Sequence, residues 1–269
     1  RCPICENARI KGGREIKTRT TFRLTKEVQI DYNADAFIQA ILYKNDLFTL
    51  KHILITHTHW DHLAMGELLL REMSYLPPKH MITVYLTEEA YGIVQRTDDL
   101  IVRNDEKISK MLEGIIRFQQ VHFYEEFQAG EVFVTPLKGM HHGLIEKNSA
   151  LYFIKLPSGR TLLYALDTGY FPEETFLWLQ GHRLDFLIIE ATFGDADRGL
   201  EPYGHLDIKS VNHVMDQLFG QGTIDKNTEV YLTHMIHKHT MTHEKMEKYY
   251  EKYDRPWTVK AAFDGLKIG

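Results

Sequence analysis

Short apolar runs alternate with helical spacings along most of the chain. Runs of strand length occur at residues 53–55, 81–86, 131–137, 149–156, 161–166, 184–189 and 230–232. Apolar residues at three- and four-residue intervals predict helices near 35–43, 63–70, 173–181, 207–219, 242–252 and over much of 88–117. Alternation over 21–24 and 28–30 predicts a hairpin. Strands and helices that alternate in this way indicate a layered α/β architecture.

The composition is that of a soluble globular protein, with 43% hydrophobic and 26% charged residues among 269. We expect one domain over residues 1–269, since no linker or internal repeat interrupts the pattern. No apolar run approaches the ~20 residues of a membrane helix, and no signal-peptide pattern opens the chain. We therefore expect no membrane contact and a cytoplasmic location. The chain starts with arginine instead of methionine, so we also expect further residues upstream of Arg1.

The charge is uneven along the chain. Residues 1–30 hold eight Lys or Arg against three Glu, whereas the formal net charge of the whole chain is −5. A solvated surface explains this basic segment more simply than a site for an anionic substrate does. The acidic balance of the whole chain argues against a dedicated nucleic-acid surface.

The most informative motif follows the predicted strand 53–55. Residues 56–62 read Thr-His-Thr-His-Trp-Asp-His, which places His57, His59, Asp61 and His62 within six positions. Imidazole nitrogens and carboxylate oxygens are the donors of hydrolytic zinc, manganese or iron sites. A cluster this dense is a rare event for a chain with 15 His in 269 residues. The sequence therefore predicts a metal site at this strand end.

Other candidate ligands also come after predicted strands. They are His141 and His142 after 131–137, Asp167 after 161–166, and His234 after 230–232. Adjacent residues usually point in different directions, so one of the two neighbouring histidines could be a ligand. Asp167 either caps the turn before Gly169 or has its charge compensated by a metal ion.

Two further pairs have a chemical and a plainer interpretation. Glu190 ends the run 184–189, and a carboxylate that orients the imidazole of His205 would make a general acid. Taken alone, His205 is more often a surface loop residue. Cys2 and Cys5 form a Cys-x-x-Cys pair, which supplies half of a tetrahedral zinc site and needs partners from elsewhere.

The order of these motifs resembles that of the metallo-β-lactamase fold over residues 20–269. The resemblance implies a four-layer αβ/βα sandwich with a dinuclear site between two sheets. It assigns His57, His59 and His141 to one ion, Asp61, His62 and His234 to the other, and Asp167 to a bridging position. The two divalent ions would be Mn²⁺, Zn²⁺, Fe²⁺ or Ni²⁺.

Within that superfamily the chain resembles the PhnP-type phosphodiesterases of the carbon–phosphorus lyase pathway. The motifs that carry this resemblance are Cys2-x-x-Cys5, Asp167-Thr168, His205-Leu206-Asp207, Leu232-Thr233-His234-x-x-His237 and Phe263-Asp264-Gly265. It implies a structural zinc held by Cys2, Cys5 and His237, with the remaining ligand upstream of Arg1. Residues 1–20 would then form an N-terminal zinc-knuckle segment.

Glu190-Ala191-Thr192-Phe193 and Gly204-His205 are similar to motifs of the tRNA 3′-end processing endonucleases of the same fold. This resemblance implies that His205 donates a proton to the leaving oxygen and that Glu190 orients it. Asp61 and Asp167 would hold the attacking water. These assignments imply a phosphodiesterase.

The substrate expectation comes from the spacing of two ligands. The tRNA enzymes carry a long arm between the third-motif histidine and the bridging aspartate, whereas only residues 142–166 separate His141 from Asp167. We therefore expect a small phosphodiester, such as ribosyl 1,2-cyclic phosphate or a 2′,3′-cyclic nucleotide, and not a large nucleic acid. A tRNA-processing-type endonuclease and a thioesterase or lactamase remain as alternatives. Dimerisation is common in the family, which leaves a homodimer open.

Overall fold

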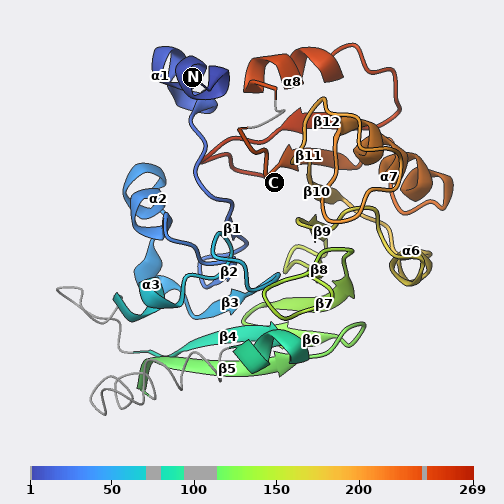
Figure 1. Cartoon of the computed structure of the whole chain (residues 1–269). Helices are drawn as coiled ribbons and strands as arrows, with labels where there is room; N and C mark the ends of the chain where they lie inside the picture. The colour runs from blue at the N-terminus through green and yellow to red at the C-terminus, as the bar shows by residue number, and fades with distance from the viewer. Residues whose placement is uncertain (1, 71–79, 94–113, 238–240) are drawn as a thin grey trace.

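Two β-sheets lie face to face between outer layers of helices (Figure 1). The computed structural model describes residues 2–70, 80–93, 114–237 and 241–269. The first sheet has the order β1-β2-β3-β4-β5, formed by Phe22–Arg23, Val28–Ile30, His52–Leu54, Ile82–Thr87 and Ile116–Val121. β1 and β2 form the expected antiparallel hairpin, and β2 to β5 are parallel. The carboxyl ends of β2 to β5 therefore lie at one edge of this sheet.

The second sheet has the order β12-β11-β10-β9-β8-β7-β6. Its strands are β6 Phe127–Ala129, β7 Val132–Lys138, β8 Ala150–Lys155, β9 Thr161–Ala165, β10 Phe186–Glu190, β11 Glu229–Thr233 and β12 Thr258–Ala261. Strands β9 to β12 are parallel. Because β8 is antiparallel to both β7 and β9, β7 runs in the same direction as β9. Five strands, β7, β9, β10, β11 and β12, thus end at the same edge.

The α-helices that lie wholly within the described residues are α1 Pro3–Lys11, α2 Ala36–Tyr43, α3 Met65–Leu70, α6 Glu173–Leu179, α7 Ile208–Gly220 and α8 His243–Tyr250. Three apolar cores separate the layers. Residues such as Leu54 and Tyr152 fill the space between the sheets. Val211 of α7 and Met246 of α8 pack on the second sheet, whereas Leu68 of α3 packs on the first. The four-layer αβ/βα sandwich expected from the resemblance is therefore confirmed. Within the described part of the chain, no helix is long and apolar enough to cross a bilayer.

The predicted strands and the helices at α2, α3, α6, α7 and α8 are confirmed. Within the predicted helical stretch 88–117, residues 88–93 are helical as expected, whereas the prediction is wrong at its end, because residues 116 and 117 begin β5. Residues 94–113 of that stretch lie outside the described residues. The pattern missed β5, β6 and β12, and each of these is an edge strand with partly exposed side chains. A strand that is only partly buried needs few apolar residues, so its hydrophobic signal is weak.

Candidate metal centre

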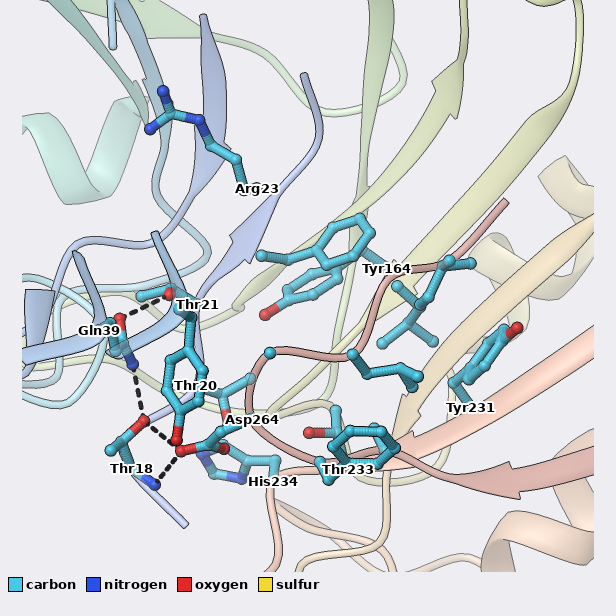
Figure 2. A pocket seen from close by; sticks show the side chains of 18 of the residues that line it. Thr18, Thr20, Thr21, Arg23, Gln39, Tyr164, Tyr231, Thr233, His234 and Asp264 are labelled. Atoms are coloured by element: carbon cyan, nitrogen blue, oxygen red, sulfur yellow. Dashed lines mark hydrogen bonds between the residues drawn. The ribbon is translucent and has the colours of Figure 1, made fainter. Parts of the chain in front are cut away.

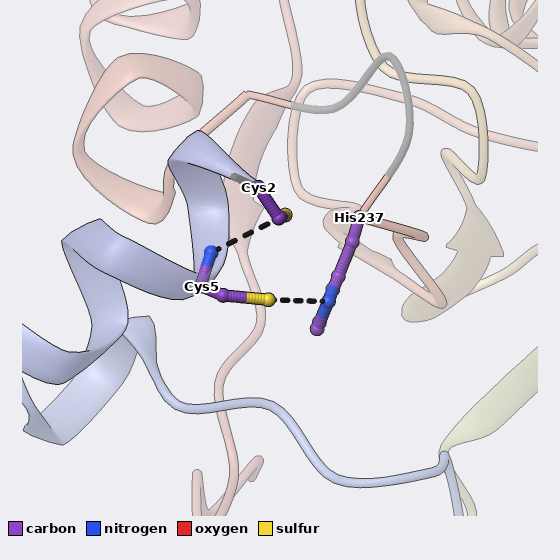
Figure 3. Close-up of side chains that lie close together, drawn as sticks. All are labelled: Cys2, Cys5 and His237. Atoms are coloured by element: carbon purple, nitrogen blue, oxygen red, sulfur yellow. Dashed lines mark hydrogen bonds between the residues drawn. The ribbon is translucent and has the colours of Figure 1, made fainter.

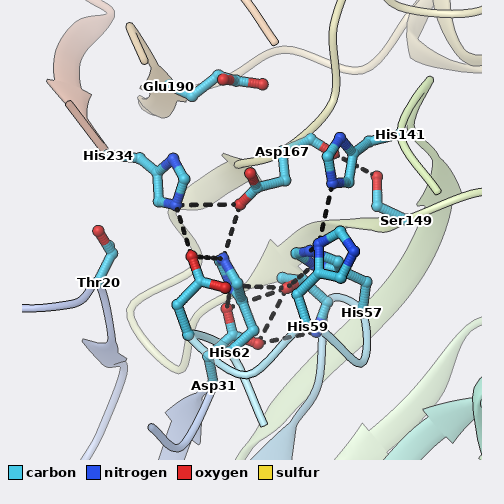
Figure 4. Close-up of polar contacts among 12 residues, drawn as sticks. Thr20, Asp31, His57, His59, His62, His141, Ser149, Asp167, Glu190 and His234 are labelled. Atoms are coloured by element: carbon cyan, nitrogen blue, oxygen red, sulfur yellow. Dashed lines mark hydrogen bonds and ion pairs between the residues drawn. The ribbon is translucent and has the colours of Figure 1, made fainter. Parts of the chain in front are cut away.

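The side chains of the predicted metal site converge where strand ends of the two sheets meet (Figure 4). The first sheet contributes residues 57–62, from the loop after β3. The second sheet contributes His141 after β7, Asp167 after β9, Glu190 at the end of β10, and His234 after β11. The shared direction of these four strands explains why residues far apart in sequence lie together.

Three non-glycine residues at these strand ends have left-handed backbone conformations. The φ angles are 59° at Asp31, 48° at Asp167 and 58° at His234. Such conformations cost roughly 1–3 kcal/mol each and persist where the surroundings hold them. At Asp167 the backbone is held by the Ser149 hydroxyl, which donates to the Asp167 carbonyl at 2.6 Å. The strained conformations thus occur at two proposed ligands and at the aspartate that lies behind His62.

His57, His59 and His141 form a cluster of converging ring nitrogens. The Nδ1 atom of His59 lies 2.9 Å from Nε2 of His57 and 3.3 Å from Nε2 of His141. Burial lowers the pKa of His141 to about 4 and the pKa of His57 well below its usual range. Neutral imidazoles are the form that binds metals, so this cluster fits a divalent cation. His142 is exposed and belongs to neither cluster, with Nδ1 3.2 Å from the Tyr203 hydroxyl.

Asp61, His62 and His234 form a second cluster, next to Asp167. One carboxylate oxygen of Asp167 lies 2.8 Å from Nε2 of His62 and 3.3 Å from Nε2 of His234. Burial would raise the pKa of Asp167, but the charges of His234 and His62 outweigh it and hold the pKa well below the usual range. Asp167 also groups with His57 of the first cluster. The donor set therefore fits two cations with this carboxylate between them.

Asp31 lies behind the second cluster and was missed by the sequence analysis. Its fully buried carboxylate contacts Nδ1 of His62 at 2.7 Å and accepts a hydrogen bond from the Thr56 amide at 2.9 Å. A carboxylate in this position fixes the ring orientation of a ligand histidine. The sequence does carry a signal for Asp31, because this residue directly follows the apolar strand β2, much as Asp167 follows β9.

His205 lies beside the bridging position. Its Nδ1 atom is 3.0 Å from Glu190 and 3.1 Å from Asp167. Burial opposes protonation of His205, but the hydrogen bond to Glu190 and the charges of both carboxylates outweigh it, so its pKa is raised. The structure thus brings Glu190 and His205 together in the arrangement of an orienting carboxylate and a proton donor.

A glycine allows the two loops of this arrangement to approach. Gly169 has φ +59°, and a Cβ atom there would lie 2.6 Å from the Pro202 carbonyl oxygen. Glu190 is fully buried and also accepts hydrogen bonds from the Thr168 amide at 2.6 Å and from the Thr192 hydroxyl. The same carboxylate therefore holds both the loop of Asp167 and the ring of His205.

A cavity of about 880 Å³ opens beside the second cluster (Figure 2). Asp61 and His234 line it, together with the segments 17–24 and 262–268. At its polar end, the Thr18 hydroxyl donates to Asp264 at 2.7 Å. At its apolar end, Phe22 and Tyr164 stack with their ring centroids 5.9 Å apart. The second cluster is therefore reachable from a large open space.

Cys2, Cys5 and His237 form a separate cluster at the N-terminus of α1 (Figure 3). The Cys5 sulfur lies 3.1 Å from Nδ1 of His237, and the Cys5 amide donates to the Cys2 sulfur at 3.5 Å. Both thiols are free. Two sulfurs and one imidazole nitrogen fit three corners of a tetrahedral zinc site.

The chain matches the sequence profile described as "Beta-lactamase superfamily domain" over residues 34–243. No curated protein matches it. Among solved structures, a "new diphosphatase from the PhnP family" aligns with a TM-score of 0.70 and 19% identity, over 100% of this chain and 90% of that one. Zn²⁺-bound PqqB from Methylobacterium extorquens aligns with a TM-score of 0.65 and 19% identity, over 100% and 93%. Human tRNase Z, short form, gives a TM-score of 0.61 and 17% identity, over 93% and 90%.

At these identities the solved structures show a shared fold. The profile match covers most of the chain, including the loop with four predicted ligands. The described side chains supply the donor sets that a metal-dependent hydrolase needs. The chain therefore belongs to the beta-lactamase superfamily and is a metal-dependent hydrolase with the metallo-β-lactamase fold.

Proposed function

We propose that this protein is a dinuclear-metal phosphodiesterase that acts on small cyclic phosphodiesters. Ribosyl 1,2-cyclic phosphate and 2′,3′-cyclic nucleotides are the substrates that we favour. The observation that carries the proposal is the position of His205, oriented by Glu190 and 3.1 Å from the carboxylate between the two clusters. An acid at this point serves a reaction with a poor leaving group, such as the alkoxide of a phosphodiester.

The residues divide the chemistry between them. His57, His59 and His141 would hold one ion, and Asp61, His62 and His234 the other, with Asp167 shared. Two divalent ions bound there would neutralise phosphoryl oxygens and lower the pKa of bound water. Asp61 and Asp167 accept hydrogen bonds from the attacking water and orient it. His205 donates its proton to the departing oxygen while Glu190 holds the ring in place.

Two further observations support this substrate class. Two of the structural neighbours are called a diphosphatase and a tRNase, and both names describe enzymes that hydrolyse a P–O bond. The span between His141 and Asp167 consists of a loop, β8, a short turn and β9. It leaves no protruding arm for a large RNA, so a small substrate is favoured.

A panel of substrates tests the proposal directly. Purified protein is loaded with Mn²⁺, Zn²⁺ or Ni²⁺ and assayed with bis-p-nitrophenyl phosphate, a lactoyl thioester and a chromogenic β-lactam. We expect turnover of the diester, and then of the small cyclic phosphodiesters, in at least one metal form. Thioester or lactam turnover without diesterase activity under every metal would overturn the proposal. Cleavage of a tRNA precursor in preference to the small diesters would favour the endonuclease alternative.

We also propose that Cys2, Cys5 and His237 hold a structural zinc ion. The change Cys5→Ser should lower the zinc content by one ion per chain and lower the Tm by several degrees, because a bound metal stabilises the folded state. It should change kcat little, because the cluster contributes no residue to the catalytic clusters. Elemental analysis, thermal unfolding and the diesterase assay measure these effects.

The matched pair for this zinc proposal is His237→Ala against His122→Ala, which alters an exposed histidine. Only the first change should release zinc. Unchanged zinc content in both Cys5→Ser and His237→Ala would contradict the assignment.

A further inference from the structure

Glu146 is a buried carboxylate that contacts the metal-centre loop without belonging to either cluster. It is 2% exposed. One carboxylate oxygen accepts a hydrogen bond from the Thr58 amide at 2.8 Å, and the other accepts from the Thr58 hydroxyl at 2.6 Å. Thr58 is the residue between His57 and His59. Both acceptor oxygens of Glu146 are therefore directed at the segment that carries two of the three clustered imidazoles.

The same carboxylate belongs to the loop that carries the third imidazole. The amide of Ser149 donates to the carbonyl of His141 at 2.7 Å, and the amide of Leu144 donates to the Thr58 hydroxyl at 3.2 Å. A Cβ atom at Gly143 would collide with the Glu146 carboxylate, so a glycine lets this loop fold around it. Glu146 thus joins the two segments that hold His57, His59 and His141.

The charge of Glu146 also needs a partner. Within the described residues, no lysine, arginine or histidine forms an ion pair with it, and its hydrogen-bond donors are neutral. Burial of a carboxylate without a cation is costly. The three-histidine cluster contains no carboxylate of its own, whereas the second cluster contains Asp61 and is backed by Asp31. A cation held by three neutral imidazoles and a shared Asp167 would gain from further negative charge placed behind the imidazoles.

We propose that Glu146 is a positioning residue for the three-histidine metal position. It fixes Thr58, and thereby the spacing of His57 and His59, and it supplies negative charge to the ion bound there. Asp31 has the corresponding place behind His62 at the other position. The inference rests on the metal positions of the proposed function and not on the substrate.

Metal titration tests this proposal without any activity assay. Metal-free protein is titrated with Mn²⁺ by calorimetry, because thiolates favour softer metals and Mn²⁺ therefore avoids the two thiols of the N-terminal cluster. Wild-type protein should show two binding events. In Glu146→Gln, one of them should weaken about 10- to 100-fold, the usual effect of losing such a partner. The other should keep its affinity.

Two variants, each lacking a ligand of one metal position, identify the position that Glu146→Gln weakens. With His59→Ala, which removes a ligand of the three-histidine position, adding Glu146→Gln should not weaken the remaining site further. With His234→Ala, which removes a ligand of the other position, Glu146→Gln should weaken the remaining site by its full factor. The control is Glu89→Gln, because this exposed carboxylate accepts a hydrogen bond from the Lys147 amide of the same loop at 2.7 Å but does not contact Thr58.

Equal weakening at both positions, or unchanged affinity at both, would overturn the proposal. A lower melting temperature of the metal-free protein with unchanged Mn²⁺ affinity would show that Glu146 is only structural. If Glu146→Gln does not fold, Thr58→Val removes the hydrogen bonds of the Thr58 hydroxyl to Glu146 and to the Leu144 amide but keeps the buried carboxylate, and it should weaken the same metal position. If the wild-type protein showed no diesterase activity, the proposed function would fail. Weaker Mn²⁺ binding at one position in Glu146→Gln would still support this inference.

Discussion

Replacement of His205 by alanine should lower kcat for an unactivated dialkyl phosphodiester by about 10²- to 10⁴-fold, the range that a general acid contributes. The reason is that the departing alkoxide then takes no proton from the protein. The loss should be much smaller with bis-p-nitrophenyl phosphate, because p-nitrophenolate leaves without protonation. Steady-state kinetics with both substrates measure the difference.

Three controls separate this role from a loss of structure. Metal content should stay at the wild-type value in His205→Ala, since His205 belongs to neither proposed three-ligand set. Glu190→Gln should reproduce part of the kcat loss, because it weakens the contact of 3.0 Å that orients the ring. His142→Ala alters an exposed histidine near the centre and should change kcat little. Full activity of His205→Ala on the unactivated diester would remove His205 from the mechanism.

The change Asp167→Asn should lower kcat by about 10³-fold or more, since a bound Lewis acid is worth several kcal/mol of transition-state stabilisation. Asp167 is the carboxylate that groups with residues of both clusters, so both of the proposed ions would need its charge. We expect at least one ion to be lost on dialysis. Elemental analysis and kcat measure the effect, and chelation of wild-type protein followed by metal restoration should reproduce it reversibly.

The matched control for this prediction is Asp185→Asn. Asp185 lies near the opposite end of β10 and accepts a hydrogen bond from the Thr161 amide at 2.8 Å. Its replacement should affect stability but not metal content. Two tightly bound ions and an undiminished rate in Asp167→Asn would contradict the bridging role.

The interior of the fold could be predicted from the sequence, because strands such as β8 and β10 are almost wholly apolar where both faces are covered. The edge strands β5 and β12 could not, since partial exposure admits polar residues at alternate positions. The helix α1 has no buried residue and so leaves no periodic signal.

The residues of the site also divide into those that the sequence predicts and those that it does not. Local patterns alone predicted ligands in residues 57–62, whereas the resemblance was needed to join them to His141, Asp167 and His234. Asp31 was missed although it follows an apolar strand. Glu146 could not be predicted, because its contact with Thr58 joins irregular loops 88 residues apart.

The proposed ligands come from both sheets, so a complete metal site exists only in the folded chain. The supply of metal would therefore affect the stability of this protein as well as its rate. Each ion that binds only the folded chain adds about 4 kcal/mol to its stability when free metal is a thousandfold above the Kd. In a metal-poor cell the chain would unfold more often and be degraded faster by proteases. The abundance of the enzyme, and not only its rate, would then follow the metal status of its surroundings.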